Sequence, residues 1–165
     1  MPEEAGQTRC MPELEDGSDT NDRRRLSNAA LIVRAAEALN PQCLGEGFWV
    51  ADVGAAVEAE DGRVFTGACI GGHLSICAEL GALSQLVAAT APRVSRVVAV
   101  WRDPADAVLH VIPPCGRCRE VIKSLSEHNL ETLVIIGPEH TAKLRDLLPY
   151  AGWYAEAVHS PPPAF

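Results

Sequence analysis

Cys77-Ala78-Glu79 and Pro114-Cys115-Gly116-Arg117-Cys118 are the two stretches that decide how this chain folds and what it binds. Residues three apart are neighbours on a helix, so a helix opening at Cys115 presents both sulfurs of the second stretch on one side. Cys77 supplies a third sulfur from elsewhere in the chain. Three protein ligands plus a water are typical of catalytic zinc, whereas structural zinc normally has four protein ligands. The two stretches therefore predict an open Zn²⁺ site.

This pattern resembles the zinc deaminase signature, in which a Glu two residues after the first ligand carries protons and a Pro-Cys-x-x-Cys segment supplies the other two ligands. The flanking segments Asp61–Gly67 and Arg145–Pro149 also resemble cytidine deaminase sequences, and the resemblance runs from about Leu26 to Trp153. Within that family, Cys77–Leu80 and Cys115–Arg119 are most similar to the blasticidin-S deaminase and three-cysteine cytidine deaminase branch.

The resemblance implies a three-layer α/β/α sandwich with a mixed sheet of about five strands. It implies hydrolytic, zinc-dependent conversion of a cytosine nucleoside or analogue, of the cytidine, deoxycytidine or blasticidin S type, to the uracil form with release of ammonia. Cys77, Cys115 and Cys118 then hold the metal, and Glu79 is the catalytic proton carrier. The partner is a small-molecule substrate, and the family leads us to expect a homotetramer or a dimer.

Three thiolates on Zn²⁺ leave a net charge of about −1. This charge weakens the ability of the metal to lower the pKa of its bound water unless a nearby cation offsets it. Arg117 and Arg119 are the candidates for this charge balance, and Arg117 could donate a hydrogen bond to a coordinating sulfur. Many three-cysteine cytidine deaminases carry an Arg directly after the Cys-Ala-Glu motif, where this chain has Leu80.

Four alternatives remain open at this point. Cys115 and Cys118 could form a redox dithiol, since a Cys-x-x-Cys pair is also typical of redox proteins. A structural zinc site could recruit Cys69 or His73 as a fourth ligand. The metal could also stabilise a non-catalytic interaction domain, or the enzyme could deaminate another aminated heterocycle.

The substrate pocket is expected to differ from that of plain cytidine deaminases. Those enzymes usually bind ribose through an Asn-x-Glu-Asn stretch, which is shortened here to Ala68–His73 and contains neither an amide nor a carboxylate. An aromatic residue that usually lines the pocket corresponds to Ala51. We expect Ala51, His73 and Trp153 near the substrate, and a sugar-side specificity that is broadened or redirected.

Composition limits the function classes. The 165 residues are 47% apolar, which suits one domain, and the net charge of −8 argues against a nucleic-acid partner. No apolar run approaches the ~20 residues that span a bilayer, and the N-terminus lacks a hydrophobic signal core, so we expect no membrane association and a cytoplasmic protein. Six irregularly spaced cysteines there favour thiols and metal ligands over disulfides, and Cys10, Cys43 and Cys69 remain unassigned.

Residues 1–21 read as a disordered acidic tail, 22–155 as the catalytic domain, and 156–165 as a disordered C-terminal tail. The spacing of apolar residues predicts helices from Asn21 or Asp22 through Leu39, over 75–91, and from Cys115 to about Asn129. It predicts strands over 48–57, 63–69, 96–101, 109–112 and 133–136, and a short strand or turn with a brief helical segment within 141–153. Asp61-Gly62 predicts a hairpin turn between the first two strands.

Overall fold

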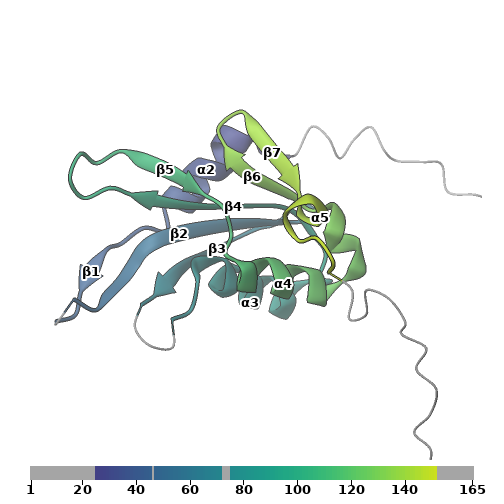
Figure 1. Cartoon of the computed structure of the whole chain (residues 1–165), viewed down its shortest axis with the longest axis horizontal. Helices are drawn as coiled ribbons and strands as arrows, with labels where there is room; N and C mark the ends of the chain where they lie inside the picture. The colour runs from purple at the N-terminus through teal and green to yellow at the C-terminus, as the bar shows by residue number, and fades with distance from the viewer. Residues whose placement is uncertain (1–24, 46, 72–74, 152–165) are drawn as a thin grey trace, which may run out of the picture.

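One mixed sheet lies between two layers of helices in the computed structural model, which describes residues 25–45, 47–71 and 75–151 (Figure 1). Helix α2 (Asn28–Ala36) covers one face, and helices α3 (Ala78–Ala89) and α4 (Gly116–Leu125) cover the other. The predicted α/β/α sandwich is therefore confirmed. The predicted tails, 1–21 and 156–165, lie outside the described residues.

Five strands form the core of the sheet: β2 (Trp49–Ala59), β3 (Val64–Ile70), β4 (Val94–Arg102), β5 (Leu109–Ile112) and β6 (Leu133–Gly137). Strand β2 runs antiparallel to β3 on one side and to β4 on the other. Strand β4 in turn pairs antiparallel with β5 and parallel with β6, which makes the sheet mixed as predicted. The short strands β1 (Gln42–Cys43) and β7 (His140–Lys143) extend it.

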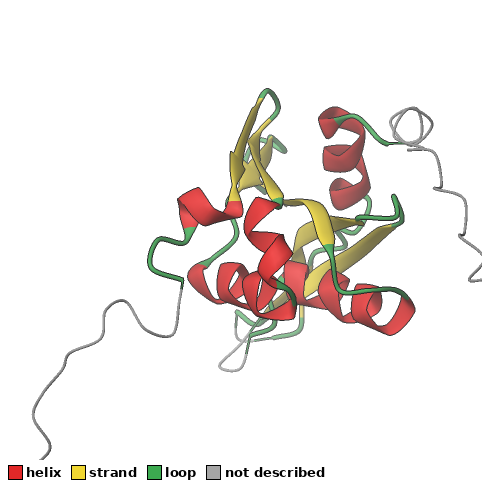
Figure 2. Cartoon of the chain, turned by 90° about the vertical axis from the view of Figure 1, so that its right-hand side faces the viewer, coloured by secondary structure: helices red, strands yellow, loops and turns green. Residues whose placement is uncertain are grey.

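The central strands are buried on both faces, because helices lie on both sides of the sheet (Figure 2). On β2, Val57 packs toward α3 and α4, whereas its neighbour Ala56 packs toward α2. Val97 and Val98 divide in the same way on β4. Side chains alternate between the two faces of a strand, so a strand covered on both sides needs a continuous apolar run.

The Asp61-Gly62 hairpin forms as predicted. Gly62 has a φ of +84°, a conformation that favours glycine, and the Ala59 N–H donates to the Arg63 carbonyl at 2.8 Å. The Asp61 carboxylate accepts hydrogen bonds from the Arg63 side chain and from the Thr90 hydroxyl. These bonds hold the β2–β3 turn against the C-terminal end of α3.

All three predicted helices are shorter than the sequence indicates, and α3 spans Ala78–Ala89 instead of 75–91. Helix α2 begins at Asn28, not near Asn21 or Asp22, because Ser27 caps it by accepting a hydrogen bond from the Ala30 N–H at 3.1 Å. Helix α4 ends at Leu125 instead of continuing to Asn129. A 3₁₀ helix, η2 (Glu127–Glu131), follows it.

Buried Asn129 explains the early end of α4. Its side-chain amide donates to the Ile122 carbonyl at 2.8 Å, and its oxygen accepts from the Val94 N–H at 2.9 Å. The side chain thus ties the end of α4 to the start of β4. The last helix of the described residues, α5 (Leu144–Leu147), follows β7 directly.

Gly67 allows α3 to lie unusually close to β3. A Cβ atom at this position would be 2.4 Å from the Ala78 carbonyl oxygen and 2.5 Å from the Ala82 nitrogen. The first turn of α3 therefore rests directly on the strand, which sets the position of Cys77. Within the described ranges, no helix is long and apolar enough to cross a membrane.

Candidate active site and metal centre

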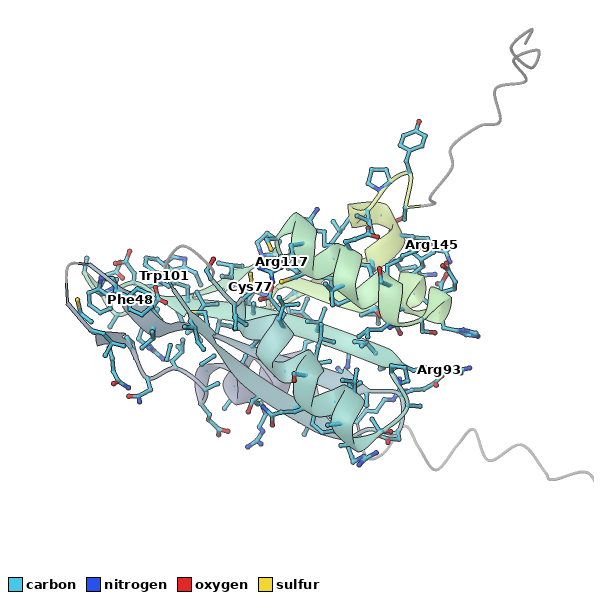
Figure 3. The ribbon with its side chains drawn as sticks, turned by 90° about the horizontal axis from the view of Figure 1, so that it is seen from below. Phe48, Cys77, Arg93, Trp101, Arg117 and Arg145 are labelled. Carbon is cyan, nitrogen blue, oxygen red and sulfur yellow. The ribbon has the colours of Figure 1, made fainter. Side chains whose placement is uncertain are left out.

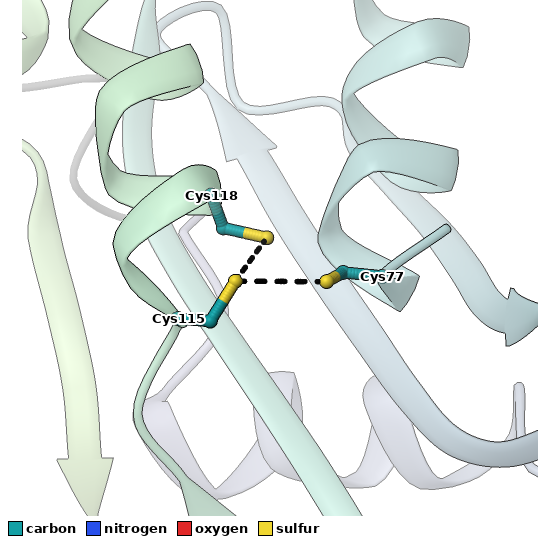
Figure 4. A group of neighbouring side chains, drawn as sticks. All are labelled: Cys77, Cys115 and Cys118. Carbon is teal, nitrogen blue, oxygen red and sulfur yellow. Dashed lines mark hydrogen bonds between the residues drawn. The ribbon is translucent and has the colours of Figure 1, made fainter. Parts of the chain in front are cut away.

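Three sulfur atoms meet between the N-terminal ends of α3 and α4. The Sγ of Cys115 lies 3.6 Å from that of Cys77 and 3.6 Å from that of Cys118 (Figure 4). All three sulfurs lie within 4.8 Å of one another. Tetrahedral zinc with Zn–S bonds of ~2.3 Å separates its sulfur ligands by about 3.8 Å. The donor set and its spacing therefore fit Zn²⁺.

Each helix presents a cysteine at the position that precedes its first residue. Cys77 is the N-cap of α3 and Cys115 is the N-cap of α4, both with extended backbone, while Cys118 lies in the first turn of α4. The Pro113-Pro114 pair precedes Cys115. Because proline is disfavoured in a helix except in its first turn, this pair keeps α4 from beginning earlier in the chain. Free N–H groups and the positive end of the helix dipole stabilise thiolates here.

The three thiols differ in pKa. Burial tends to raise the pKa of Cys115, but the backbone N–H groups of Cys118 and Arg117 together with the neighbouring thiols lower it below the ordinary value. Burial raises the pKa of Cys77, and burial together with the Glu79 carboxylate raises that of Cys118 strongly. Because zinc binds thiolates, metal binding at this cluster must release protons.

Glu79 lies beside this cluster in the first turn of α3 and is only 4% exposed. Burial raises the pKa of its carboxyl group, and the Cys118 thiol acts in the opposite direction. Glu79 is not one of the three clustered metal-competent groups. A buried carboxyl with a raised pKa is suited to accept and return protons.

A cavity of about 240 Å³ opens onto this cluster. Cys77, Glu79 and Cys115 form part of its wall. The remaining wall is mostly apolar and includes Val53, Cys69, Ile70, Ser75, Ile112 and Pro113, none of which the sequence predicted as pocket residues. Ile112 and Pro113 could have been predicted as pocket residues, because they directly precede the metal-binding segment Pro114-Cys115. Nothing in the sequence around Val53 indicates that it lies in the pocket.

The two arginines hold backbone around the cluster. Arg117 Nη1 donates to the Ser75 carbonyl at 3.0 Å and thereby joins α4 to the segment before α3. Arg119 donates to the Pro114 carbonyl and to the Leu147 carbonyl, both at 2.8 Å. Neither contact involves a sulfur, and a role in charge balance stays a prediction.

Of the predicted pocket residues, only Ala51 lies in the described part of the chain. It does not line the cavity. It adopts a φ of 53° in an irregular segment of β2 between Val50 and Gly54, and its carbonyl accepts from the Asn40 N–H. His73 and Trp153 lie outside the described residues.

Cys69 belongs to the cavity wall but not to the sulfur cluster. Its thiol donates to Asp52 Oδ1 at 2.9 Å, and its sulfur accepts from the Val53 N–H at 3.3 Å. Cys69 thus stabilises the irregular segment of β2 and does not supply a fourth metal ligand. Cys43 is exposed on β1, and Cys10 lies outside the described residues.

Known proteins resemble this chain in sequence and in fold. No protein-family model matches the sequence. The cytidine deaminase of Mycobacterium tuberculosis is 37% identical over 102 residues, which cover 60% of this chain and 71% of the relative. The chain belongs to the cytidine deaminase family. Blasticidin-S deaminase from Bacillus cereus is 27% identical over 103 residues, covering 59% of this chain and 74% of that protein.

Crystal structures of cytidine deaminases support this membership. The enzyme from Burkholderia pseudomallei superposes with a TM-score of 0.60 at 29% identity, covering 77% of this chain and all of that one. The enzyme from M. tuberculosis superposes with a TM-score of 0.54 at 28% identity, and the match covers 75% of this chain and 92% of that enzyme. The Cys77, Cys115 and Cys118 cluster is consistent with the zinc site of cytidine deaminases.

Proposed function

We propose that the protein is a zinc-dependent hydrolytic deaminase that converts a cytosine nucleoside or nucleoside analogue to its uracil form and releases ammonia. The observation that carries this proposal is the position of Glu79. Its carboxyl group is buried in the wall of the same apolar cavity that Cys77 and Cys115 line. The named activities of the relatives, cytidine deaminase and blasticidin-S deaminase, support the same reaction class.

Cys77, Cys115 and Cys118 would hold Zn²⁺ and leave one coordination position open. Bound there, zinc supplies Lewis acidity, which lowers the pKa of a water molecule toward neutrality. Glu79 accepts a proton from the water and delivers protons to the ring nitrogen and to the leaving amine. One water and one amino-substituted ring thus yield a carbonyl and one ammonia.

The cavity positions the substrate ring and excludes water. Val53 lies on one strand and Ile112 on another, and both side chains line the space next to the sulfurs. Apolar walls of this kind suit the faces of a flat pyrimidine ring. They also keep bulk water from the buried carboxyl of Glu79, which preserves its raised pKa.

The sugar side of the substrate is the less constrained part. The described wall near the end of β3 offers the Cys69 thiol and the Ser75 hydroxyl as side-chain polar groups. Neither is the amide or carboxylate expected for recognition of ribose. This supports a nucleoside analogue at least as well as cytidine, and a small-molecule substrate in either case. Assembly as a tetramer or dimer stays a prediction.

A substrate panel tests the proposal. Zinc-loaded protein is incubated with cytidine, deoxycytidine, blasticidin S, guanine and adenine, and ammonia release is measured. We expect release from at least one of the three cytosine compounds. Release from guanine or adenine alone would shift the function to another aminated heterocycle. No release from any compound, with zinc bound stoichiometrically, would favour a non-catalytic interaction domain.

A further inference from the structure

A further thiol, that of Cys69, lies in the wall of the zinc-site cavity and has no part in the deamination chemistry described above. It shares this wall with Cys77 and Cys115. It is not one of the three clustered sulfurs, and Cys69 and Cys77 are both free thiols. The cavity therefore holds one thiol that does not bind the metal close to thiols that do.

The backbone places Cys69 opposite Cys77. Ile70 and Ile76 form an antiparallel bridge in which the N–H of each donates to the carbonyl of the other at 2.9 Å. Next to such a hydrogen-bonded pair, the residue before one member faces the residue after the other, and these are Cys69 and Cys77. Cα atoms at facing positions of this kind are ~4.5 Å apart, and their side chains stand on the same face. Cys77 still has extended backbone, with φ −65° and ψ 150°, before α3 begins.

The packing of α3 on β3 keeps the two cysteines close together. Cys69 packs against a buried cluster that contains Ala78, the residue after Cys77. Gly67, two residues before Cys69, lets the same first turn of α3 rest on the strand. A disulfide requires Cα atoms roughly 4.4–6.8 Å apart and side chains that do not point away from each other. Facing positions on one side of an antiparallel pair meet both requirements.

Cys77 lies between the sulfur cluster and Cys69. Its Sγ is 3.6 Å from that of Cys115, and it makes no side-chain capping bond to α3. Arg117, which Figure 3 shows beside Cys77, donates to the Ser75 carbonyl at 3.0 Å and holds this segment between β3 and α4. Because the backbone is held and the sulfur is not, rotation about the Cα–Cβ bond of Cys77 can turn its sulfur from the cluster toward Cys69.

We propose that Cys69 and Cys77 are a site of reversible disulfide formation, at which a hydroperoxide oxidises the protein and causes it to release zinc. The disulfide removes Cys77 from the metal. Only Cys115 and Cys118 then remain as protein ligands, fewer than a stable zinc site has. This inference goes beyond the proposed function, because it requires Cys77 to be a zinc ligand and does not require that the protein deaminates any compound.

The oxidation takes place in two steps. As a metal ligand Cys77 is a thiolate, the form of cysteine that reacts with hydroperoxides. Its sulfur attacks one peroxide oxygen, the O–O bond breaks, and Cys77 becomes a sulfenic acid while hydroxide or alkoxide leaves. The Cys69 sulfur then attacks the Cys77 sulfur, the S–O bond breaks, and the oxygen leaves as water with the Cys69 proton. The two sulfurs lose two electrons, which the peroxide gains.

Cys69 is suited to the second step for two reasons. Cys115 and Cys118 are still bound to the metal when Cys77 is first oxidised, whereas Cys69 is free to attack. Its thiol also donates a hydrogen bond to Asp52 Oδ1 at 2.9 Å, so a carboxylate is in place to receive the proton as the S–S bond forms.

Disulfide mapping tests the inference on the unmodified protein. Zinc-loaded protein is treated with one equivalent of hydrogen peroxide, released zinc is measured with a chromophoric chelator, and free thiols are alkylated before tryptic digestion. Cys69 and Cys77 fall in one tryptic peptide, 64–93, whereas Cys115 falls in 103–117 and Cys118 in 118–119. We expect peptide 64–93 to escape alkylation and to be lighter by two hydrogens, in proportion to the zinc released. Zinc release accompanied only by disulfides that join different peptides would overturn the inference.

Cys69→Ser provides a second test, because serine can still donate to Asp52 but cannot form the disulfide. Without Cys69, excess peroxide should oxidise Cys77 further to a sulfinic acid, which thiols do not reduce. After treatment with dithiothreitol and zinc, the unmodified protein should regain most of its zinc binding and Cys69→Ser at most about half of it. Cys43→Ser, an exposed cysteine outside the cavity, is the matched control and should recover as the unmodified protein does. Equal recovery of the two variants would overturn the inference, and since neither test uses deamination, the proposed function stands or fails separately.

Discussion

Cys77 Sγ lies 3.6 Å from Cys115 Sγ, although the two residues are 38 positions apart in the chain. Each residue is the N-cap of a helix, and the two helices pack on the same face of the sheet. The distance between the sulfurs is therefore set by the positions of α3 and α4 on that face. Any change that moves either helix should alter metal affinity, which links the stability of the core to the chemistry of the site.

Glu79→Gln should separate metal binding from turnover. The amide keeps the size of the side chain but cannot carry protons, so we expect stoichiometric zinc and a loss of ammonia release of at least ~10²-fold. Zinc is measured by atomic emission and turnover by ammonia assay. Glu120→Gln, on the exposed side of α4, is the control and should retain full activity. Near-normal turnover by Glu79→Gln would remove Glu79 from the mechanism.

Removal of zinc should destabilise the protein. A ligand present at 100 to 1,000 times its Kd adds about 3–4 kcal/mol, so a chelator should lower the Tm of the zinc-loaded protein by roughly 10 °C. Cys118→Ser should have the lower Tm of the zinc-free protein from the start, and a chelator should not change it. Cys43→Ser, which changes an exposed cysteine outside the cluster, should respond as the unmodified protein does. An unchanged Tm after complete zinc removal would contradict this prediction.

Gly67→Ala should weaken both the fold and the zinc site. The new Cβ would lie 2.4 Å from the Ala78 carbonyl, so α3 must move off the strand, at a cost of about 1–3 kcal/mol. Zinc affinity, measured by competition with a chromophoric chelator, should fall with it because Cys77 moves.

Gly81→Ala is the matched control for this substitution. Gly81 lies on α3 itself, and its added Cβ would meet the Ala68 carbonyl at 3.6 Å, an ordinary contact. Alanine in the middle of a helix should stabilise the protein by ~0.5–1 kcal/mol. Equal effects of Gly67→Ala and Gly81→Ala in urea unfolding would show that close approach of α3 to β3 is unimportant.

Glu58 and Arg96 form the buried ion pair that anchors α2. The nitrogen–oxygen distance is 2.7 Å, and the guanidinium also donates to the Asn28 side chain and the Leu26 carbonyl. Removing one charge should cost about 3–5 kcal/mol, because the other stays buried without a partner. Unfolding of Arg96→Met in urea measures this cost.

A surface pair provides the comparison for Arg96→Met. Arg93→Met breaks the exposed pair with Glu60 and should cost at most ~1 kcal/mol. Similar costs for the two substitutions would contradict the anchoring role of the buried pair.

The Asp61 turn should make stability depend on pH. Hydrogen bonds from the Arg63 side chain and backbone, and from Thr90, hold the pKa of Asp61 far below its ordinary value. A carboxyl whose pKa is lowered by folding stabilises the folded state at pH values above its pKa in the unfolded chain, which is about 4. This stabilisation is lost as the pH falls toward the pKa of the carboxyl in the folded protein. Asp61→Asn should therefore lower the Tm at pH 7, and the difference should narrow steadily below about pH 4. A Tm difference that stays constant down to pH 2.5 would show that the charge is irrelevant.

Much of the fold could be predicted because its signals are local. Asp61-Gly62 specifies a turn through the φ of one glycine, and the apolar run of β4 reflects burial on both faces. The end of α4 could not be predicted, because Asn129 closes it through bonds to Ile122 and to Val94 of another element. The start of α2 has a local signal, the N-cap Ser27, and is held in addition by Arg96, whose guanidinium donates to the Asn28 side chain from 68 residues further along the chain.

By itself, the sequence determined the chemistry of the site: three thiols, one carboxylate, and the spacing that distinguishes Cys115 and Cys118 from an isolated pair. The sequence also predicted that Cys77 joins them, but only the tertiary structure decided how close the three sulfurs lie, that Glu79 is buried beside them, and that Val53 and Ile112 form the wall. The physical reason is the range of the forces. Turn and helix preferences act over a few residues, whereas burial and the distances between segments arise from packing two layers of helices onto one sheet.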